Sequence, residues 1–225
     1  MKIVLATRGS RLALWQIAAL YGGLLREQPS AVVEFSILKS TGDRVDRLDV
    51  SSLGRTGVFT VEIDRSVLEG ASDAGVHSLK DMTTSLPEGL VLAGTLARAP
   101  AQDALISSGG RDGRKLAELP RRARVGTGSL RRVAMLKRAR PDLEIVPMRG
   151  NVETRLTKLA QGEADAIVMA VAGLERLGLG DRITEVLGPP GFLPAVGQGI
   201  IGLTCRAGDE RMGKTLASIS DRETW

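Results

Sequence analysis

The chain has 225 residues, of which 43% are hydrophobic and 25% charged, a composition typical of a globular protein and not of a disordered one. This length predicts one large domain or two modest ones. The formal charge is only +5, and no apolar run approaches the roughly 20 residues that cross a bilayer. One cysteine and one histidine exclude an internal disulfide and a Cys/His zinc cage, so we expect a cytoplasmic protein without such a metal site.

Short β-like runs alternate with helical stretches along the chain. We expect strands at residues 2–7, 32–38, 74–77, 90–93, 104–107, 124–126, 144–148, 165–170 and 200–204. The spacing of apolar residues predicts helices at 14–25, 58–68, 129–140 and 152–161. We interpret the polar, glycine-containing stretch at 40–57 as a mobile loop. Strand–helix alternation of this kind predicts an α/β fold with largely parallel sheets.

Prolines and glycines punctuate the alternating pattern twice, near residues 96–101 and 193–199. We therefore expect two α/β lobes with a hinged cleft between them, which is a common place for a ligand. A strand at 200–204 that returns to the first lobe would make that lobe discontinuous. The expected division is then domain 1 at 1–98 plus 198–225 and domain 2 at 99–197.

Three stretches combine a strand, a tight Gly/Ser/Thr turn and the start of a helix, each with an adjacent arginine: residues 7–10, 126–132 and 149–151. Backbone N–H groups and the helix dipole favour an anion at such a turn, and arginine adds bidentate bonds to carboxylates. None of the three has the spacing of a phosphate loop or a dinucleotide fingerprint. One such turn often only caps a helix, but three together predict an anion site, for phosphate or for carboxylate.

Eight basic residues and no acidic one lie between Arg121 and Arg140. Such a run attracts anions, nucleic acid among them, but only 3% of the residues are aromatic, which leaves few platforms for stacking bases. Arg131 and Arg132 fall in the first turn of a predicted helix, where a cation opposes the helix dipole, so we assign them a ligand role. We interpret Lys137, Arg138 and Arg140 as solvating the outer face of that helix.

Residues 76–81 read Val-His-Ser-Leu-Lys-Asp and follow a predicted strand, whose end is a favoured functional position. Lys80 and Asp81 place a cation beside a carboxylate, which can stabilise a developing cation or shuttle a proton. From spacing alone, a solvated salt bridge is the more common explanation of such a dipeptide. His77 is more often structural than catalytic, and Ser78 lacks the sequence context of a catalytic serine.

Together these motifs resemble the porphobilinogen deaminase (hydroxymethylbilane synthase) family. The resemblance runs in register from Lys2 to about Thr224 and rests on ATRGS at 6–10, LALWQ at 12–16, HSLKD at 77–81, GTGSLRR at 126–132, RGNVETR at 149–155 and LPAVGQG at 193–199. It implies a cytoplasmic, monomeric transferase of tetrapyrrole and heme biosynthesis. The enzyme would condense four porphobilinogens head to tail, with loss of ammonia, to linear hydroxymethylbilane. The implied fold has two lobes like those of type II periplasmic binding proteins, with mixed, mostly parallel sheets and a hinged interdomain cleft.

The resemblance also implies partners and site residues. The partners are porphobilinogen and linear oligopyrroles, whose acetate and propionate groups agree with an anion site, and neither nucleic acid nor a membrane. Asp81 and Lys80 would be catalytic, with Asp81 holding pyrrole N–H groups and stabilising cationic azafulvene-like intermediates. The residues implied for the dipyrromethane cofactor are Arg8, Ser10, Ser78, Lys80, Asp81, Thr127, Ser129, Arg131, Arg132, Arg149, Gly150 and Arg155. Those implied for substrate are Arg8, Arg149, Arg155, Arg176 and Gln198.

The sequence departs from the family pattern at several places. The family commonly has a lysine where Thr56 stands, and it often has a proline after the residue that matches Asp81. Its third, C-terminal domain carries the cysteine that attaches the cofactor, and Cys205 lies in a different stretch. We therefore expect family domain 3 to be absent from this chain or supplied separately, and Cys205 to be a buried strand residue without covalent cofactor. The alternative to the enzyme is a truncated, non-catalytic homologue that binds pyrroles or other polycarboxylates.

Overall fold

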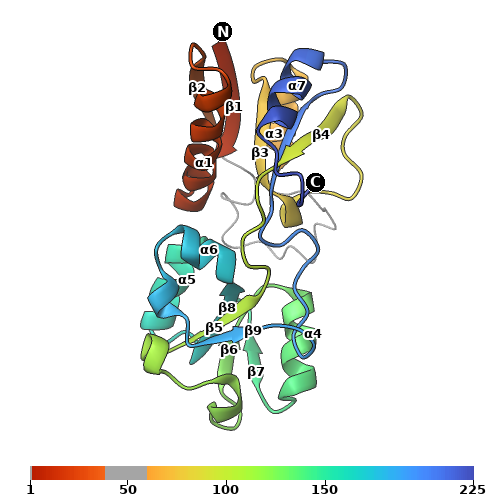
Figure 1. Cartoon of the computed structure of the whole chain (residues 1–225). Helices are drawn as coiled ribbons and strands as arrows, with labels where there is room; N and C mark the ends of the chain where they lie inside the picture. Colours follow the sequence, from red (N-terminus) through yellow and green to blue (C-terminus); the bar gives the residue numbers. More distant parts are fainter. Residues whose placement is uncertain (1, 39–59) are drawn as a thin grey trace. The chain divides into compact units, whose positions relative to one another are not determined.

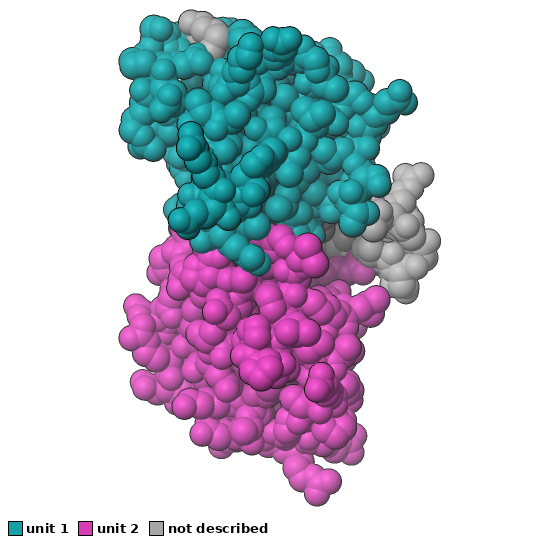
Figure 2. All heavy atoms as spheres, turned by 45° about the vertical axis from the view of Figure 1, so that its right-hand side comes forward, with its two compact units in different colours: residues 1–98, 200–225 teal, residues 99–199 magenta. Residues whose placement is uncertain are grey.

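The computed structural model describes residues 2–38 and 60–225, and the chain divides into two compact units (Figures 1 and 2). Unit 1 consists of Met1–Arg98 and Ile200–Trp225, and unit 2 of Ala99–Gly199. From the sequence we predicted that domain 2 ends at residue 197 and that the chain then returns to domain 1. In the structure, unit 2 ends at residue 199 and unit 1 resumes at residue 200. The predicted loop at 40–57, with Thr56, lies outside the described residues.

Unit 1 is built on a five-stranded sheet with the strand order β2-β1-β3-β10-β4 (Figure 1). Strand β1 pairs in parallel with β2 and β3, whereas β10 pairs antiparallel with its two neighbours, β3 and β4. Strand β10 therefore runs opposite to the other four strands of this sheet. The elements of unit 1 are β1 (Lys2–Arg8), α1 (Arg11–Glu27), β2 (Val32–Leu38), α3 (Val61–Leu68), β3 (Ala74–Ser78), the 3₁₀ turn η2 (Leu79–Asp81), β4 (Leu90–Thr95), β10 (Ile201–Arg206) and α7 (Glu210–Ser218).

The core of unit 1 forms where the apolar stripe of α1 meets the sheet. Ile17, Leu20 and Leu24 recur at helical spacing and are at most 3% exposed, and they belong to one core cluster with Leu5 of β1 and Leu203 of β10. Burying each of these side chains contributes about 1.5–3 kcal/mol. This packing holds α1 against the sheet of unit 1.

Unit 2 repeats the arrangement with the strand order β7-β6-β8-β5-β9. Strand β6 pairs in parallel with β7 and β8, and β5 pairs antiparallel with β8 and β9, so here β5 is the reversed strand. The elements of unit 2 are β5 (Asp103–Ser107), η3 (Gly110–Asp112), η4 (Leu116–Glu118), β6 (Arg124–Gly126), α4 (Leu130–Ala139), β7 (Glu144–Val146), α5 (Val152–Ala160), β8 (Ala166–Ala170), α6 (Val171–Arg176), η5 (Gly180–Arg182) and β9 (Glu185–Leu187).

The central strands of unit 2 are buried on both faces. Along β8, Ile167 and Met169 join one core cluster with residues of α5 and α6, while Ala166 and Val168 join a second cluster with Leu136 of α4. Successive side chains of a strand point to opposite faces, so helices cover both faces of this sheet. This explains why residues 166–169 read as a continuous apolar run and not as an alternating one.

The predicted mixed α/β fold is confirmed, with four of the five strands in each sheet running in one direction. The predicted strands overlap the observed ones, and the strand at 200–204 does return to unit 1 as β10. The prediction lacked strand β9 and helices α6 and α7. It also lacked the reversal of β5 and β10, because a buried apolar strand has the same sequence pattern in either direction.

Candidate functional site

The predicted site residues of unit 1 lie at one edge of its sheet. Arg8 ends β1 and Ser78 ends β3. The two strands are parallel neighbours in the register Ala6 to Gly75, so both carboxyl ends reach the same edge. This edge is the usual ligand-binding position of an α/β sheet.

Lys80 and Asp81 follow β3 directly, in the 3₁₀ turn η2. Lys80 is exposed and Asp81 is half-buried, so the Asp81 carboxylate stays accessible while the fold holds its backbone. Gln16, which is 3% exposed, donates from its Nε2 to the Ser78 hydroxyl at 2.9 Å and thereby ties α1 to the end of β3. The turn that carries Asp81 is thus anchored from its N-terminal side.

His77 has a structural position, which is the role that we considered more common for it from the sequence. Its side chain is 1% exposed, and Nε2 lies 3.1 Å from the Thr204 hydroxyl and 3.6 Å from the Asp64 carboxylate. Burial lowers the pKa of His77 to about 4, and burial raises the pKa of Asp64. The imidazole is therefore neutral near pH 7 and is not accessible to a ligand.

The predicted site residues of unit 2 also lie at the carboxyl ends of parallel strands. Strands β6, β7 and β8 pair through Gly126, Val146 and Ile167, and the turns that follow β6 and β7 carry the glycine-rich motifs. The Thr127 amide donates to the Val146 carbonyl at 3.0 Å, and a side chain at position 128 would approach the Met148 carbonyl to 3.2 Å. The two turns are therefore packed against each other.

Each of the three Gly/Ser turns caps a helix. The side chains of Ser10, Ser129 and Asn151 accept hydrogen bonds from backbone N–H groups in the first turns of α1, α4 and α5, respectively. A cap of this kind satisfies one of the four N–H groups that a helix start leaves without an intrahelical partner. The capping interpretation is correct for all three turns, and it is compatible with an anion bound at the other N–H groups.

Arg131 and Arg132 converge on Asp103, a residue that the sequence analysis did not single out. Asp103 is 0% exposed at the start of β5, and its Oδ2 accepts from Arg131 Nη2 at 2.7 Å. Its Oδ1 accepts from Arg132 Nε at 3.1 Å and Nη2 at 2.7 Å, and from Gln198 Nε2 at 2.9 Å. These bonds and the charge of Arg132 outweigh burial and hold the pKa of Asp103 below its ordinary value. We call these four residues the Asp103 cluster.

Two members of the Asp103 cluster make buried structural contacts that their predicted ligand roles did not include. Arg132 is 6% exposed and also donates to the Val168 carbonyl at 3.0 Å, so much of its function is structural. Gln198 is 1% exposed, and its Nε2 also donates to the Ala101 carbonyl at 2.6 Å, so it supports the cluster, while its expected substrate contact stays a prediction. Burial could be read neither from the motif matches nor from the place of Arg132 in the first turn of its helix.

The remaining predicted cations of unit 2 are partly buried. Arg155 Nε donates to the Gly150 carbonyl at 2.8 Å, which closes the turn after Arg149. Gly150 has φ of 110°, and a side chain there would meet Thr154 at 2.6 Å, so this position requires glycine. Arg176 Nη2 donates to the Gly199 carbonyl at 2.7 Å, and burial lowers the pKa of Arg176.

The basic run between Arg121 and Arg140 is largely used inside unit 2. The expected solvating role of Arg140 is wrong, whereas Lys137 is exposed as predicted. Arg140 bonds both carboxylate oxygens of Asp142 at 2.8 Å and donates to backbone carbonyls at 116, 117, 119 and 120. Lys137 donates to the Leu143 carbonyl at 2.6 Å. Because these cations bind their own chain, the run gives little support to a nucleic-acid interface.

Cys205 has the buried position that its sequence predicted. It is 1% exposed in β10, and burial raises the pKa of its thiol. Among residues 2–38 and 60–225, no group of three or more His, Cys, Asp and Glu side chains is placed to hold a metal ion. In the same part of the chain, no helix has the length and apolarity needed to span a membrane.

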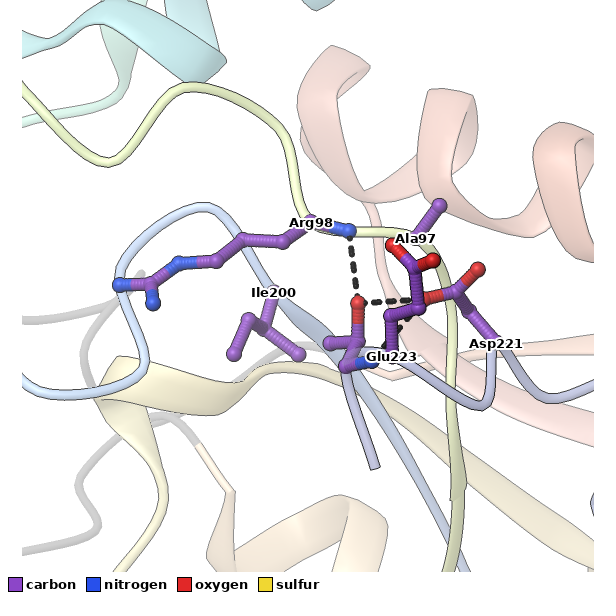
Figure 3. Close-up of a pocket in the computed structure, with 6 residues that line it drawn as sticks. Ala97, Arg98, Ile200, Asp221 and Glu223 are labelled. Carbon is purple, nitrogen blue, oxygen red and sulfur yellow. Dashed lines mark hydrogen bonds between the residues drawn. The ribbon is translucent and has the colours of Figure 1, made fainter.

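A cavity of about 340 Å³ in unit 1 contains none of the predicted site residues (Figure 3). Its polar groups bind one another, since the Thr224 hydroxyl donates to Asp221 at 2.7 Å and accepts from the Arg98 amide at 3.1 Å. Thr224 is thereby held against the segment after β4, and we assign this cavity no ligand. Its lining residues are Ala97, Arg98, Ile200, Asp221, Glu223 and Thr224.

The fold is that of two-unit solute-binding proteins. The chain is similar to the methionine-binding protein MetQ, with a TM-score of 0.61 and 13% identity over 99% of this chain and 91% of that one. It is also similar to an ancestral cationic amino acid solute-binding protein, with a TM-score of 0.58 and 18% identity over 97% and 87% of the two chains. At these identities the likeness establishes the fold class alone.

Sequence comparison identifies the family. Residues 3–214 match the family model described as porphobilinogen deaminase, dipyrromethane cofactor binding domain. The porphobilinogen deaminase of Nitratidesulfovibrio vulgaris is 45% identical over 99% of this chain and 69% of its own length. That of Syntrophomonas wolfei is 42% identical over 98% and 71%. The chain belongs to the porphobilinogen deaminase family, the hydroxymethylbilane synthase transferases of tetrapyrrole biosynthesis, and it spans about 70% of the length of these relatives.

Proposed function

We propose that this chain carries out the head-to-tail condensation of porphobilinogen to hydroxymethylbilane and that Asp81 is its catalytic carboxylate. The observation that carries the proposal is the position of Asp81, half-buried in the turn that ends β3, at the same sheet edge as Arg8. A carboxylate that is partly removed from water interacts more strongly with a cation than a fully solvated one does. Family membership supplies the reaction, and this geometry supports the choice of Asp81.

The chemistry of porphobilinogen explains the need for such a carboxylate. When the protonated amino group of its aminomethyl substituent leaves as ammonia, the C–N bond breaks with both electrons on nitrogen, and the methylenepyrrole that remains is cationic. A negative charge fixed beside that position stabilises the developing cation, and the same oxygens accept hydrogen bonds from pyrrole N–H groups. We propose this role for Asp81. Lys80 and Arg8 would then pair with carboxylates of the substrate.

In unit 2 we propose a site for the carboxylates of dipyrromethane. The group would be held by the cap turns at Thr127–Ser129 and Arg149–Gly150 and by Arg131 and Arg155. The Asp103 cluster fits such a ligand, because two guanidinium groups share one buried carboxylate and a net positive charge is left over. When bound, dipyrromethane supplies the primer to which pyrrole units are added. The arginines of this chain orient it and neutralise its charge.

Further parts of the proposal rest on the family resemblance alone. Arg149, Arg155 and Arg176 are proposed to pair with carboxylates of porphobilinogen and linear oligopyrroles. The protein is proposed to be a cytoplasmic monomer that uses neither nucleic acid nor a membrane, and sedimentation of the purified protein would test its monomeric state. Cys205, buried in β10, is proposed to carry no covalent cofactor. An intact mass with a dipyrromethane increment that disappears in Cys205→Ser would contradict this last assignment.

The function is tested by following porphobilinogen consumption and ammonia release by the purified protein, in parallel with its Asp81→Asn and Glu88→Gln variants. Glu88 is an exposed carboxylate of the same unit and serves as the matched control. We expect Asp81→Asn to lose turnover while Glu88→Gln retains it. Equal turnover by all three proteins would overturn the role of Asp81. Binding of porphobilinogen without any ammonia release by the unsubstituted protein would favour a non-catalytic homologue.

A further inference from the structure

The Asp103 cluster joins three segments of unit 2 that are far apart in sequence. Asp103 begins β5, Arg131 and Arg132 lie in the first turn of α4, and Gln198 follows β9 near the end of the unit. Four hydrogen bonds of 2.7–3.1 Å meet on the two oxygens of one carboxylate. A carboxylate that is 0% exposed persists in the charged form only when its partners compensate for lost hydration, which these bonds do.

The cluster is unbalanced in charge and asymmetric in exposure. Two guanidinium groups face one carboxylate, and both arginines lie where the N-terminal end of the α4 dipole disfavours cations. The side chain of Arg132 is 7% exposed, whereas that of Arg131 is 24% exposed. Arg131 is therefore the member through which the surplus positive charge reaches a ligand.

Arg131 is held in a definite orientation and still has donors to offer. Its Nη2 donates to Asp103, and its Nη1 donates to the Leu193 carbonyl. Arginine has five N–H donors, so these two contacts leave three. A guanidinium that is already ordered loses less conformational entropy when a carboxylate binds than a free one does.

From this geometry we infer that Asp103 is a positioning residue of the carboxylate site, which fixes the Arg131 guanidinium so that its remaining N–H groups meet a carboxylate of a pyrrole ligand. The inference rests on the proposed function for the identity of the ligand. It goes beyond that function in assigning a ligand-binding effect to a buried acidic residue, although an acidic residue is expected to repel an anion.

The test measures binding of a synthetic dipyrromethane that carries acetate and propionate groups, by calorimetry with the purified chain. Four variants are compared: Asp103→Asn, Arg131→Ala, the double variant Asp103→Asn/Arg131→Ala, and Asp142→Asn as control. Asp142 is likewise an arginine-paired aspartate of unit 2, but its partner is Arg140. We expect Asp103→Asn and Arg131→Ala each to weaken binding about tenfold, and the double variant to be no more than about twofold weaker than either. Asp142→Asn should bind within about twofold of the unsubstituted chain.

The double variant separates positioning from a general effect on folding. If Asp103 acts through Arg131, substituting Asp103 should weaken binding little further in a chain that already lacks the Arg131 guanidinium. Multiplication of the two losses to about one hundredfold would overturn the inference, as would unchanged binding by Asp103→Asn. Failure of the proposed function would give a different result. In that case the unsubstituted chain would not bind the probe, or Arg131→Ala would bind the probe as tightly as the unsubstituted chain.

A second variant keeps the inference testable if Asp103→Asn does not fold. Arg131→Lys retains the positive charge and leaves Asp103 in place, but an ammonium cannot hold the fixed, planar set of contacts that a guanidinium makes. If orientation matters, Arg131→Lys binds the probe about as weakly as Arg131→Ala. Binding by Arg131→Lys equal to that of the unsubstituted chain would show that charge alone suffices, and would overturn the positioning role.

Discussion

The two units build the same sheet but treat their key aspartates in opposite ways. In unit 1, Asp81 follows the third parallel strand and stays half-buried, with a carboxylate that a ligand can reach. In unit 2, Asp103 begins the reversed strand, is fully buried and has both oxygens occupied by neighbouring side chains. The same type of side chain is thus an accessible anion in one unit, whereas in the other unit it is a buried anion that binds two arginines. Burial and bonding partners decide the role, and residue type alone does not.

The largest expected effect concerns the accessible aspartate. Asp81→Asn keeps the shape of the side chain but removes the charge proposed to stabilise a cationic intermediate. We expect turnover to fall about 100- to 1,000-fold while affinity for porphobilinogen changes less than about threefold. Steady-state kinetics beside calorimetric binding would check this, and an Asn variant with near-normal turnover would remove the contrast between the two aspartates.

The Asp103 cluster of unit 2 is expected to contribute to the stability of the fold. Arg132→Ala removes the more buried of the two arginine partners of Asp103 and leaves part of a buried negative charge without compensation. We expect the free energy of unfolding to fall by about 3 kcal/mol, measured by urea denaturation. Arg131→Ala, whose side chain is more exposed, should destabilise the chain less and weaken ligand binding more. Equal losses of stability in both variants would contradict this division of roles.

A third prediction concerns pH and the buried histidine of unit 1. The unfolded chain takes up a proton at His77 below about pH 6.5, whereas burial delays this uptake in the folded chain to about pH 4. Stability should therefore fall by about 2 kcal/mol between pH 7 and pH 5. Burial raises the pKa of Asp64, which acts in the opposite direction, because the folded chain then takes up a proton more readily than the unfolded chain as the pH falls. In His77→Asn the dependence on pH in this window should be nearly flat.

The smallest expected effect tests whether the basic run serves a ligand or the fold. Arg140→Ala removes the pairing with Asp142 and several bonds to backbone carbonyls. We expect the free energy of unfolding to fall by about 1–2 kcal/mol, with binding of the dipyrromethane probe unchanged. Thermal unfolding and calorimetry on the same samples would measure both, and a loss of binding without a loss of stability would reverse the assignment.

Much of the architecture could be predicted from local patterns. Strand β2 begins and ends at the expected residues, Val32 and Leu38, because its flanks contain clear breaks. Helix α4 is one residue shorter at each end than predicted, because Ser129 and Arg140 are its caps. The reversed strands could not be recognised, because direction depends on pairing with strands that are distant in sequence.

The candidate site could be predicted only in part. Motif spacing located the turns at Thr127–Ser129 and Arg149–Gly150 and the dipeptide Lys80–Asp81. It gave no sign that Arg132 and Gln198 would be buried, or that Arg140 would bind its own chain, since burial follows from tertiary packing. The sequence did contain one signal, namely an aspartate at position 103 directly before the apolar residues 104–106. A charged residue at the start of a buried strand indicates a partner elsewhere in the fold.

The place of β10 in its sheet has a consequence for how the chain reaches its native state. Strand β10, Ile201–Arg206, lies between β3 and β4, and within the described sheet β4 has no neighbour other than β10. Unit 2 is one continuous segment, so it can complete its sheet as soon as residue 199 has left the ribosome. Unit 1 began first but must keep β4 unpaired until some hundred residues later, which makes its closure a slow, long-range step. The half of the molecule that carries Asp81 is thus the half that is exposed longest to misassembly during synthesis.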